Sequence, residues 1–260
     1  MKTVITTGGR PDDASRKLAM EAAKVLGYDV IERNKRSIAR IQRDYESAVL
    51  VAGSERYDLY RIGMEQPLFF HPNSAAFRLK RIITGETDPL IETAQLVNGD
   101  SFLDCTLGLG SDSIIASFVV GDAGRVHGIE GDADIAFITG RGLKSYDSYS
   151  DELIKAMESV QVIHADAVRF LESQPDASWD VVYIDPMFSA PIAESSNFTP
   201  LRKVGLQSKL TEKWVEEAKR VSKRRVVVKD RFDSPVFDTF NFVRRIRPNT
   251  KFHFGYISKE

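Results

Sequence analysis

Short apolar runs alternate with longer amphipathic segments through most of residues 101–230, and this alternation predicts a parallel β-sheet. Each apolar run has the length of one strand, and the segments between the runs have the spacing of helical residues. Repeated units of this kind place helices on both faces of a sheet. The expected strands are 101–105, 125–130, 160–164, 179–184 and 224–229.

The end of the chain follows a different pattern, in which two aromatic-rich runs stand on either side of a turn. Residues 240–243 and 252–257 flank the turn-forming residues 247–250, which predicts a closing antiparallel hairpin. The fold class is therefore α/β: a doubly wound, mostly parallel sheet with a C-terminal antiparallel hairpin.

The first part of the chain predicts a small α/β unit of its own. Apolar runs at 2–6 and 47–52 indicate buried strands, and helical spacing over 13–26 indicates a helix that Gly27 ends. The stretch 31–43 is apolar on one face and basic on the other. We expect a small N-terminal α/β subdomain at 1–66, a connector at 67–100 with helices near 73–83 and 88–97, and a main domain at 101–260.

The first strand of the main domain runs into a glycine turn that is suited to a ligand. Gly108 and Gly110 let the backbone approach a ligand closely, and Ser111 or Asp112 can cap the following helix. A dinucleotide fold has a third glycine where this chain has Ser113. Asp104, just before the turn, suits a cationic amino group and disfavours a pyrophosphate. S-adenosylmethionine, with an amino acid end and no phosphates, therefore fits better than a dinucleotide.

Acidic residues follow the next two strands at positions that suit the rest of this cofactor. Glu130 ends the second strand and can accept hydrogen bonds from both ribose hydroxyls. Asp166 follows the third strand and can bind the adenine amine, while a neighbouring backbone N–H meets a ring nitrogen. Taken singly, each acid reads as a helix cap or a surface carboxylate; together they indicate a cofactor site. The expected cofactor-binding residues are Asp104, Gly108, Gly110, Ser111, Asp112, Glu130, Gly131, Asp166, Ala167 and Asp185.

The fourth strand ends in Asp185-Pro186-Met187-Phe188, which suits methylation of an amine. Transfer of a methyl group needs the nitrogen lone pair aimed at the methyl carbon. An acid and a backbone carbonyl fixed by proline can accept the two N–H bonds of the amine, and an aromatic ring can stack on a base. We expect Asp185, Pro186 and Phe188 to be the catalytic residues.

These motifs, in this order, resemble the family of ribosomal RNA small subunit methyltransferase J. The resemblance implies a class I fold with a seven-stranded methyltransferase sheet, S-adenosylmethionine as the methyl donor with S-adenosylhomocysteine as product, and the exocyclic amine of a guanine as target. This chain departs from the family at Ser111, where the family has arginine, and at 189–194, where a lysine-rich stretch is replaced. The motifs are Asp104-x-Thr106-x-Gly108-Leu109-Gly110-x-Asp112, Ile129-Glu130, Ile163-His164-Ala165, Val182-Tyr183-x-Asp185-Pro186-Met187-Phe188 and Arg225-Val226-Val227-Val228-Lys229.

Charge is distributed unevenly along the chain, although the formal net charge is only -1. Residues 96–199 carry 5 Lys and Arg against 17 Asp and Glu, whereas residues 200–260 carry 16 against 7. A basic block suits a polyanionic partner, and we expect RNA, either ribosomal RNA or the small ribosomal subunit. Arg202, Lys203 and Lys229 are the expected substrate-binding residues.

Composition sets the remaining expectations. No apolar run approaches the roughly 20 residues of a membrane span, and the start of the chain lacks the features of a signal peptide. A single cysteine cannot form an internal disulfide, so we expect a cytoplasmic protein. His71 and His164 have no neighbours at metal-ligand spacing, so no metal is expected.

Three other functions remain open on the sequence alone. The same cofactor half would serve methylation of a small molecule or a protein side chain. A non-catalytic nucleotide-binding or RNA-binding module could share the fold, although the retained Asp185-Pro186 and Phe188 argue against loss of activity. An NAD-dependent oxidoreductase comes last, because of Ser113 and the lack of an evident hydride-transfer pair.

Overall fold

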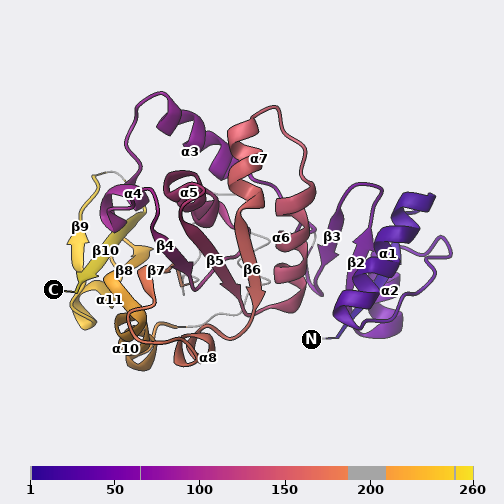
Figure 1. Ribbon diagram of the computed structural model, residues 1–260. Coiled ribbons are helices and arrows are strands. Elements are labelled where there is room, and N and C mark those ends of the chain that lie inside the picture. The colour runs from indigo at the N-terminus through magenta and orange to yellow at the C-terminus, as the bar shows by residue number, and fades with distance from the viewer. Residues whose placement is uncertain (1, 65, 187–208, 249, 260) are drawn as a thin grey trace.

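A seven-stranded sheet forms the centre of the larger part of the computed structural model (Figure 1). Its strand order is β6-β5-β4-β7-β8-β10-β9, with β4 to β8 parallel and β10 antiparallel to both of its neighbours. The predicted α/β class, with a mostly parallel sheet and a C-terminal antiparallel hairpin, is confirmed. The structure describes residues 2–64, 66–186, 209–248 and 250–259. The strands are β4 (Ser101–Asp104), β5 (Arg125–Glu130), β6 (Val160–His164), β7 (Trp179–Ile184), β8 (Ser222–Arg231), β9 (Val243–Arg245) and β10 (Phe252–Ser258).

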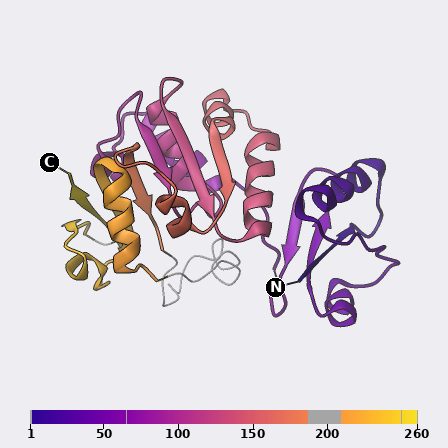
Figure 2. The same ribbon diagram turned by 60° about the horizontal axis from the view of Figure 1, so that its bottom comes forward.

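The central strands are apolar on both faces because each face supports its own hydrophobic core. Successive side chains of a strand point to opposite faces. Phe102, Tyr183 and Val227 therefore join one core, whereas Leu103 and Val182 join the other. One face is covered by α3 (Asn73–Ile83), α4 (Pro89–Ala94), α5 (Ser111–Val120), α6 (Ala133–Ser145) and α7 (Asp151–Glu158), and the other by α8 (Ala167–Glu172), α10 (Glu212–Val221) and α11 (Val236–Thr239). Figure 2 shows α8 and α10 in front of the sheet on this second face.

The N-terminal residues form a separate three-stranded sheet at the side of the molecule (Figure 1). β1 runs parallel to β2, and β3 pairs antiparallel with β2. The predicted strands at 2–6 and 47–52 and the helix at 13–26 are confirmed; β3 was not predicted. The elements are β1 (Thr3–Thr7), α1 (Asp13–Leu26), α2 (Ile38–Tyr45), β2 (Ala48–Ala52) and β3 (Tyr57–Tyr60).

The two-faced stretch 31–43 is helical only from Ile38 onward. Before that point, Asn34 and Lys35 both have positive φ angles, which a helix does not allow. The side chain of Arg33 donates to the carbonyl oxygens of Arg36 and Thr7, and that of Arg36 to Glu32. These arginines therefore stabilise a turn instead of lining one side of a helix.

The stretch 67–100 contains α3 and α4, which lie along the chain between the small sheet and the main sheet. Both of its helices, α3 and α4, pack their buried residues against the main sheet through the same core. Phe70, just before α3, lies so close to α6 that a Cβ added at Gly142 would be 2.0 Å from its ring. None of the helices in the described part of the chain has the length and hydrophobicity that crossing a bilayer requires.

Candidate functional site

The carboxyl ends of β4, β5, β6 and β7 meet at one edge of the main sheet, and the predicted acids lie there. In a doubly wound sheet, ligands bind outside this edge, at the point where the strand order reverses. Here the chain leaves β4 between β5 and β7, so the reversal falls beside the glycine turn. The acids at this edge are Asp104 on β4, Glu130 on β5, Asp166 after β6 and Asp185 after β7.

The glycine turn is held between the two neighbouring strands. The N–H of Cys105 donates to the carbonyl of Tyr183 at 2.9 Å, and the N–H of Leu107 to Ile129 at 2.9 Å. The side chain of Leu107 occupies the space over Gly128, where an added Cβ would lie 2.3 Å from its Cδ1. The turn is thereby fixed against β5 and β7 at the sheet edge.

Helix α5 begins directly after this turn, with Gly110 as its N-cap at a φ of 76°. The prediction that Ser111 or Asp112 caps this helix is wrong, because both lie inside its first turn and no side chain caps it. Asp112 instead turns toward cations on other elements. The first N–H groups of α5 therefore have no side-chain cap.

Glu130 links the end of β5 to the glycine turn. One of its carboxylate oxygens accepts a hydrogen bond from the N–H of Gly108 at 3.0 Å, and the other from the N–H of Asp132 at 2.9 Å. Burial raises the pKa of Glu130, and the backbone donors partly offset this rise. The side chain is partly exposed, so a ligand hydroxyl can still reach this carboxylate. Gly131 lies beside it at the same edge.

Asp104 lies beneath the glycine turn. It is 1% exposed and accepts hydrogen bonds from the hydroxyl of Ser113 at 2.7 Å and the N–H of Thr106 at 2.9 Å. Burial raises the pKa of Asp104 to about 7. Its carboxylate therefore binds residues on both sides of the glycine turn, Thr106 before it and Ser113 after it.

Asp166 is exposed and forms the N-cap of α8, where its side chain accepts from the N–H of Arg169 at 2.9 Å. Ala167 is the first residue of that helix. The neighbouring His164 is also exposed, at the end of β6. This corner therefore offers a carboxylate and backbone N–H groups to a ligand along the edge from Glu130.

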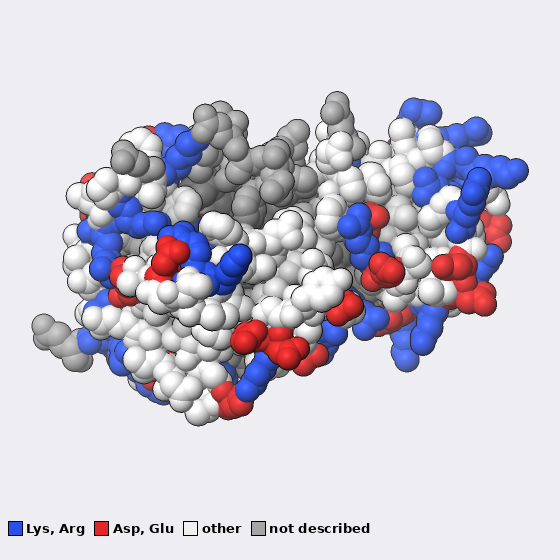
Figure 3. Space-filling view, turned by 90° about the horizontal axis from the view of Figure 1, so that it is seen from above, with Lys and Arg blue, Asp and Glu red and all other residues white. Residues whose placement is uncertain are grey.

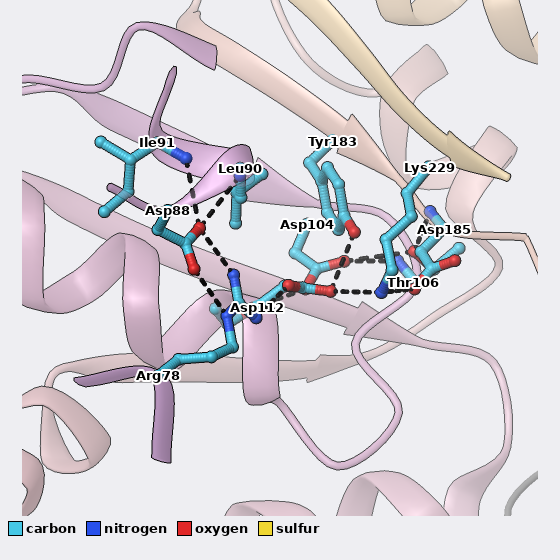
Figure 4. A network of polar contacts seen from close by, with 11 residues as sticks. Arg78, Asp88, Leu90, Ile91, Asp104, Thr106, Asp112, Tyr183, Asp185 and Lys229 are labelled. Carbon is cyan, nitrogen blue, oxygen red and sulfur yellow. Dashed lines mark hydrogen bonds and ion pairs between the residues drawn. The ribbon is translucent and has the colours of Figure 1, made fainter. Parts of the chain in front are cut away.

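The acid after β7 belongs to a charged network (Figure 4). The Nζ of Lys229 lies 2.6 Å from Asp185 and 3.1 Å from Asp112. The hydroxyl of Tyr183 donates to Asp112 at 2.8 Å, and the N–H of Asp185 donates to the hydroxyl of Thr106 at 2.7 Å. Asp185 is therefore joined both to the glycine turn and to β8. Pro186, which follows it, is buried.

Arg78, from the connector helix α3, extends this network to the other side of Asp112. Its guanidinium lies 2.5 Å from Asp112 and binds both oxygens of Asp88, at 2.8 and 2.9 Å. Neither Arg78 nor Asp88 was among the predicted site residues. Because α3 packs on α5, a residue of the connector reaches the site edge.

The two acids that share Lys229 differ in their readiness to ionise. Although burial opposes ionisation, Lys229 and Arg78 together hold the pKa of Asp112 below its usual range. Asp185 has only Lys229 beside it, and burial raises its pKa to about 6. Of the two acids that share Lys229, Asp185 therefore takes up a proton before Asp112 does.

Several predicted residues cannot be placed. Phe188, Arg202 and Lys203 lie outside the described residues. Lys229 points to the expected edge, but its ammonium group is already bound by two carboxylates.

Within the described ranges, no group of three or more His, Cys, Asp or Glu side chains is arranged to hold a metal ion.

Comparison with known proteins gives one family. The family model of S-adenosylmethionine-dependent (SAM-dependent) methyltransferases matches residues 35–241. A protein of Bacillus subtilis (strain 168), named "Uncharacterized protein YpiP", is 42% identical over 254 residues, which make up 98% of each chain. Ribosomal RNA small subunit methyltransferase J of Acinetobacter baumannii is 30% identical over 113 residues, which make up 43% of this chain and 39% of that protein.

Among solved structures, the SAM-dependent methyltransferase NGO1261 from Neisseria gonorrhoeae has the same architecture. The two chains superpose with a TM-score of 0.60 at 16% sequence identity, over 98% of this chain and 95% of the other. At this identity the likeness concerns the fold alone.

Proposed function

The chain belongs to the family of S-adenosylmethionine-dependent methyltransferases, and from this premise we propose that it methylates an exocyclic base amine, that of a guanine, in ribosomal RNA. The observation that supports this most directly is the place of Asp185. Its carboxylate ends β7 beside the glycine turn and is fixed by Lys229 at 2.6 Å. An acid held in this way can orient an amine toward the cofactor side of the site.

The donor set at the sheet edge fits S-adenosylmethionine. Glu130 and Asp166 offer carboxylates to ribose hydroxyls and to an adenine amine, and the first N–H groups of α5 and α8 are available nearby. Among the residues that the structure describes, Lys229 and Arg78 at this edge are engaged by acids and are not presented to a pyrophosphate. When bound, S-adenosylmethionine supplies a methyl group on a positively charged sulfur and leaves as S-adenosylhomocysteine.

We assign the cofactor-binding roles by position along the edge. Glu130 with Gly131 binds the ribose, and Asp166 with Ala167 binds the adenine. Gly108, Gly110 and Ser111 line the methionine end. Asp104 acts through the turn that it supports, because its carboxylate is 1% exposed.

Asp185 and Pro186 would hold the amine of the substrate. The ionised carboxylate of Asp185 accepts one N–H of the amine, and the backbone carbonyl before Pro186 accepts the second, which leaves the lone pair directed at the methyl group. Phe188 would stack on the base. After attack the nitrogen loses its proton to water, so the reaction needs no base of unusual strength. We therefore assign Lys229 the role of keeping Asp185 in place and ionised, instead of the predicted role of binding the substrate.

Charge supports an RNA substrate. Figure 3 shows Lys and Arg side chains gathered at the outer end of the N-terminal unit, on the right, and again over the left part of the main domain. Uncharged surface lies between these two regions, with Asp and Glu side chains along its lower edge in this view. A long polyanion lying across this face would meet cations at both ends, as binding to phosphates requires. The relative from Acinetobacter baumannii is itself named as a ribosomal RNA methyltransferase.

Mass spectrometry of ribosomal RNA tests the proposed target. Ribosomal RNA from cells with and without this protein is digested to nucleosides and oligonucleotides, and methylated guanosines are mapped. We expect one base-methylated guanosine to be missing without the protein and to return when purified protein and S-adenosylmethionine are added. Identical maps in the two RNAs would reject ribosomal RNA and favour a small-molecule or protein substrate.

A charge reversal tests whether RNA binds through the predicted basic residues. Replacing Arg202 and Lys203 by Glu should raise the KM for RNA and flatten its salt dependence, while S-adenosylhomocysteine binds as before. The matched control replaces Lys213 and Lys219 of α10 by Glu, with the same change in net charge. If the two double variants behave alike, net charge alone matters and the predicted RNA contact is rejected.

A further inference from the structure

We propose that Arg61 of the N-terminal unit is a positioning residue for cofactor binding, acting through Asp132 on Glu130. This inference rests on the proposed role of Glu130 at the ribose. Arg61 directly follows β3, and Figure 1 shows β3 beside α6, the helix that begins after Glu130. A residue of the small sheet therefore reaches the turn that carries the cofactor acid of the main sheet.

Arg61 makes two buried ion pairs across this contact. Its side chain is 7% exposed, and its two terminal nitrogens lie 2.6 Å from Asp132 and 2.8 Å from Asp134. The hydroxyl of Thr3, on β1, donates to Asp134 at 2.8 Å. Both acids belong to the start of α6, so the small sheet holds this helix end with a cation that water hardly reaches.

Asp132 connects this ion pair to Glu130. Its N–H donates to Glu130 at 2.9 Å, while one carboxylate oxygen accepts from the first N–H groups of α6 at Asp134 and Ile135. Arg61 binds the other oxygen. The turn between β5 and α6 is thus held at three points, two of them within the main domain and one from the N-terminal unit.

Loss of Arg61 would leave two neighbouring carboxylates without their shared cation. Asp134 is 2% exposed, and burial together with the charge of Asp132 already raises its pKa. An unpaired buried charge is costly, and the protein relieves the cost by moving the group toward water. Movement of Asp132 would withdraw its N–H from Glu130, so the carboxylate would lose the orientation that two ribose hydroxyls need.

A second ion pair crosses the same contact and serves as a matched control. Arg141 of α6 lies 3.0 Å from Glu21 of α1, but these side chains are 36% and 34% exposed. Exposed pairs contribute little free energy. Neither residue contacts the turn that carries Glu130. Changes at Glu21 therefore test the contact between the two units without reaching the cofactor acid.

The coupling must also work in reverse, because linkage between two binding events is reciprocal. If contact of the N-terminal unit favours cofactor binding, the cofactor favours the contact. Amide exchange of β1 and β3 should then slow when S-adenosylhomocysteine binds, although neither strand is expected to touch it.

Calorimetry with S-adenosylhomocysteine on the full chain tests the proposal. We expect Arg61→Met to raise the Kd at least about tenfold, Glu21→Gln to change it less than about twofold, and Arg61→Lys to restore part of the affinity. Thr3→Val removes the hydroxyl that donates to Asp134 and accepts from Arg61 at 3.5 Å, but it leaves the bond between Arg61 and Asp132, and it should resemble Glu21→Gln.

Unchanged affinity in folded Arg61→Met, or equal losses in Thr3→Val and Arg61→Met, would overturn the role of Arg61 and leave the proposed function standing. A wild-type protein that binds no S-adenosylhomocysteine would instead reject the proposed cofactor site. If Arg61→Met does not fold, Asp132→Asn replaces it, since this variant keeps the N–H and an oxygen for α6 but loses the charge that Arg61 binds. Unchanged affinity there would overturn the proposal equally.

Discussion

Glu130 and Asp185 end two strands of the same sheet edge, yet the chain holds them in opposite ways. Glu130 accepts hydrogen bonds from two backbone N–H groups, which carry no net charge and do not titrate. Asp185 is paired with Lys229, which also contacts Asp112, and Asp112 is bound in turn by Arg78. The first acid is bound directly by backbone N–H groups, the second by a cation in a network that draws charges from three other elements.

This difference matches the different tasks that we propose for the two acids. An acid that binds ribose hydroxyls needs a fixed direction, and backbone donors provide it without competing for all lone pairs. An acid that orients an amine must stay ionised in a buried place, and only a nearby cation opposes the cost of burial there. Changes at Glu130 should therefore affect binding, and changes around Asp185 should affect turnover and its pH dependence.

The largest effect is expected from Asp185→Ala. Turnover should fall at least about 100-fold, because the amine loses its orientation, while S-adenosylhomocysteine affinity stays nearly intact. Methyl transfer to the identified RNA, with calorimetry beside it, measures both. Asp180→Ala, at the opposite end of β7 where the acid binds Ser101, is the control and should retain turnover. Near-normal transfer by Asp185→Ala would show that the active site lies elsewhere.

Glu130→Ala should act on binding instead. Hydrogen bonds to a charged group contribute about 1.5–3 kcal/mol, so S-adenosylhomocysteine should bind roughly 10- to 150-fold more weakly. With saturating cofactor, turnover should recover most of its wild-type value. A Glu130→Ala variant with normal affinity for S-adenosylhomocysteine but low turnover would contradict the binding role of Glu130 and give it the role proposed for Asp185.

Lys229→Met should shift the pH dependence of turnover. In the wild type, turnover should fall as the pH drops through about 6, because Asp185 takes up a proton there. Removing a neighbouring cation raises a carboxyl pKa further, by about 1–3 units, so this acid limb moves to higher pH and turnover at pH 7 drops roughly tenfold. Lys223→Met, on the same strand but paired with Asp180, is the control. A limb that does not move would mean that Lys229 does not control Asp185.

Asp166→Ala should have the smallest effect. The side chain is exposed, so affinity for S-adenosylhomocysteine should fall only about threefold, in the lower range of a hydrogen bond. Loss of the α8 cap should lower the free energy of unfolding by about 1 kcal/mol, seen as a shift of about 2–4 °C in Tm. An affinity loss as large as that of Glu130→Ala would show that Asp166 contributes as much to S-adenosylhomocysteine binding as Glu130 does, contrary to this prediction.

The main sheet was predictable because its signal is local. Each buried strand from β4 to β7 is a short apolar run, and its limits agree with the prediction to within one residue. β8 extends to Arg231, beyond the predicted end at residue 229, because pairing with β10 continues through polar residues. β3 was not predicted because it is short and contains the charged Asp58. It is a strand because it pairs with β2, and this pairing is not visible in the local sequence pattern.

The site was predictable only where a residue follows a strand. Glu130, Asp166 and Asp185 come directly after apolar runs, so their common edge follows from the parallel sheet. The contacts of Arg78 with Asp112 and of Arg61 with the start of α6 join elements far apart in the chain, and no spacing in the sequence indicates them. The capping expectation failed because Gly110 is the N-cap and both Ser111 and Asp112 lie inside the first turn of α5. The side chain of Asp112 is bound by Lys229 and Arg78, which lie far from it in the chain.

The chain's one cysteine has a practical consequence for observing this site. Cys105 lies at the root of the glycine turn, 3% exposed, and burial raises the pKa of its thiol. A protonated, covered thiol does not react with alkylating reagents until the surrounding structure opens. The alkylation rate of the native protein therefore measures how often the turn between β4 and α5 opens, with no engineered label. A ligand that closes this turn should lower that rate.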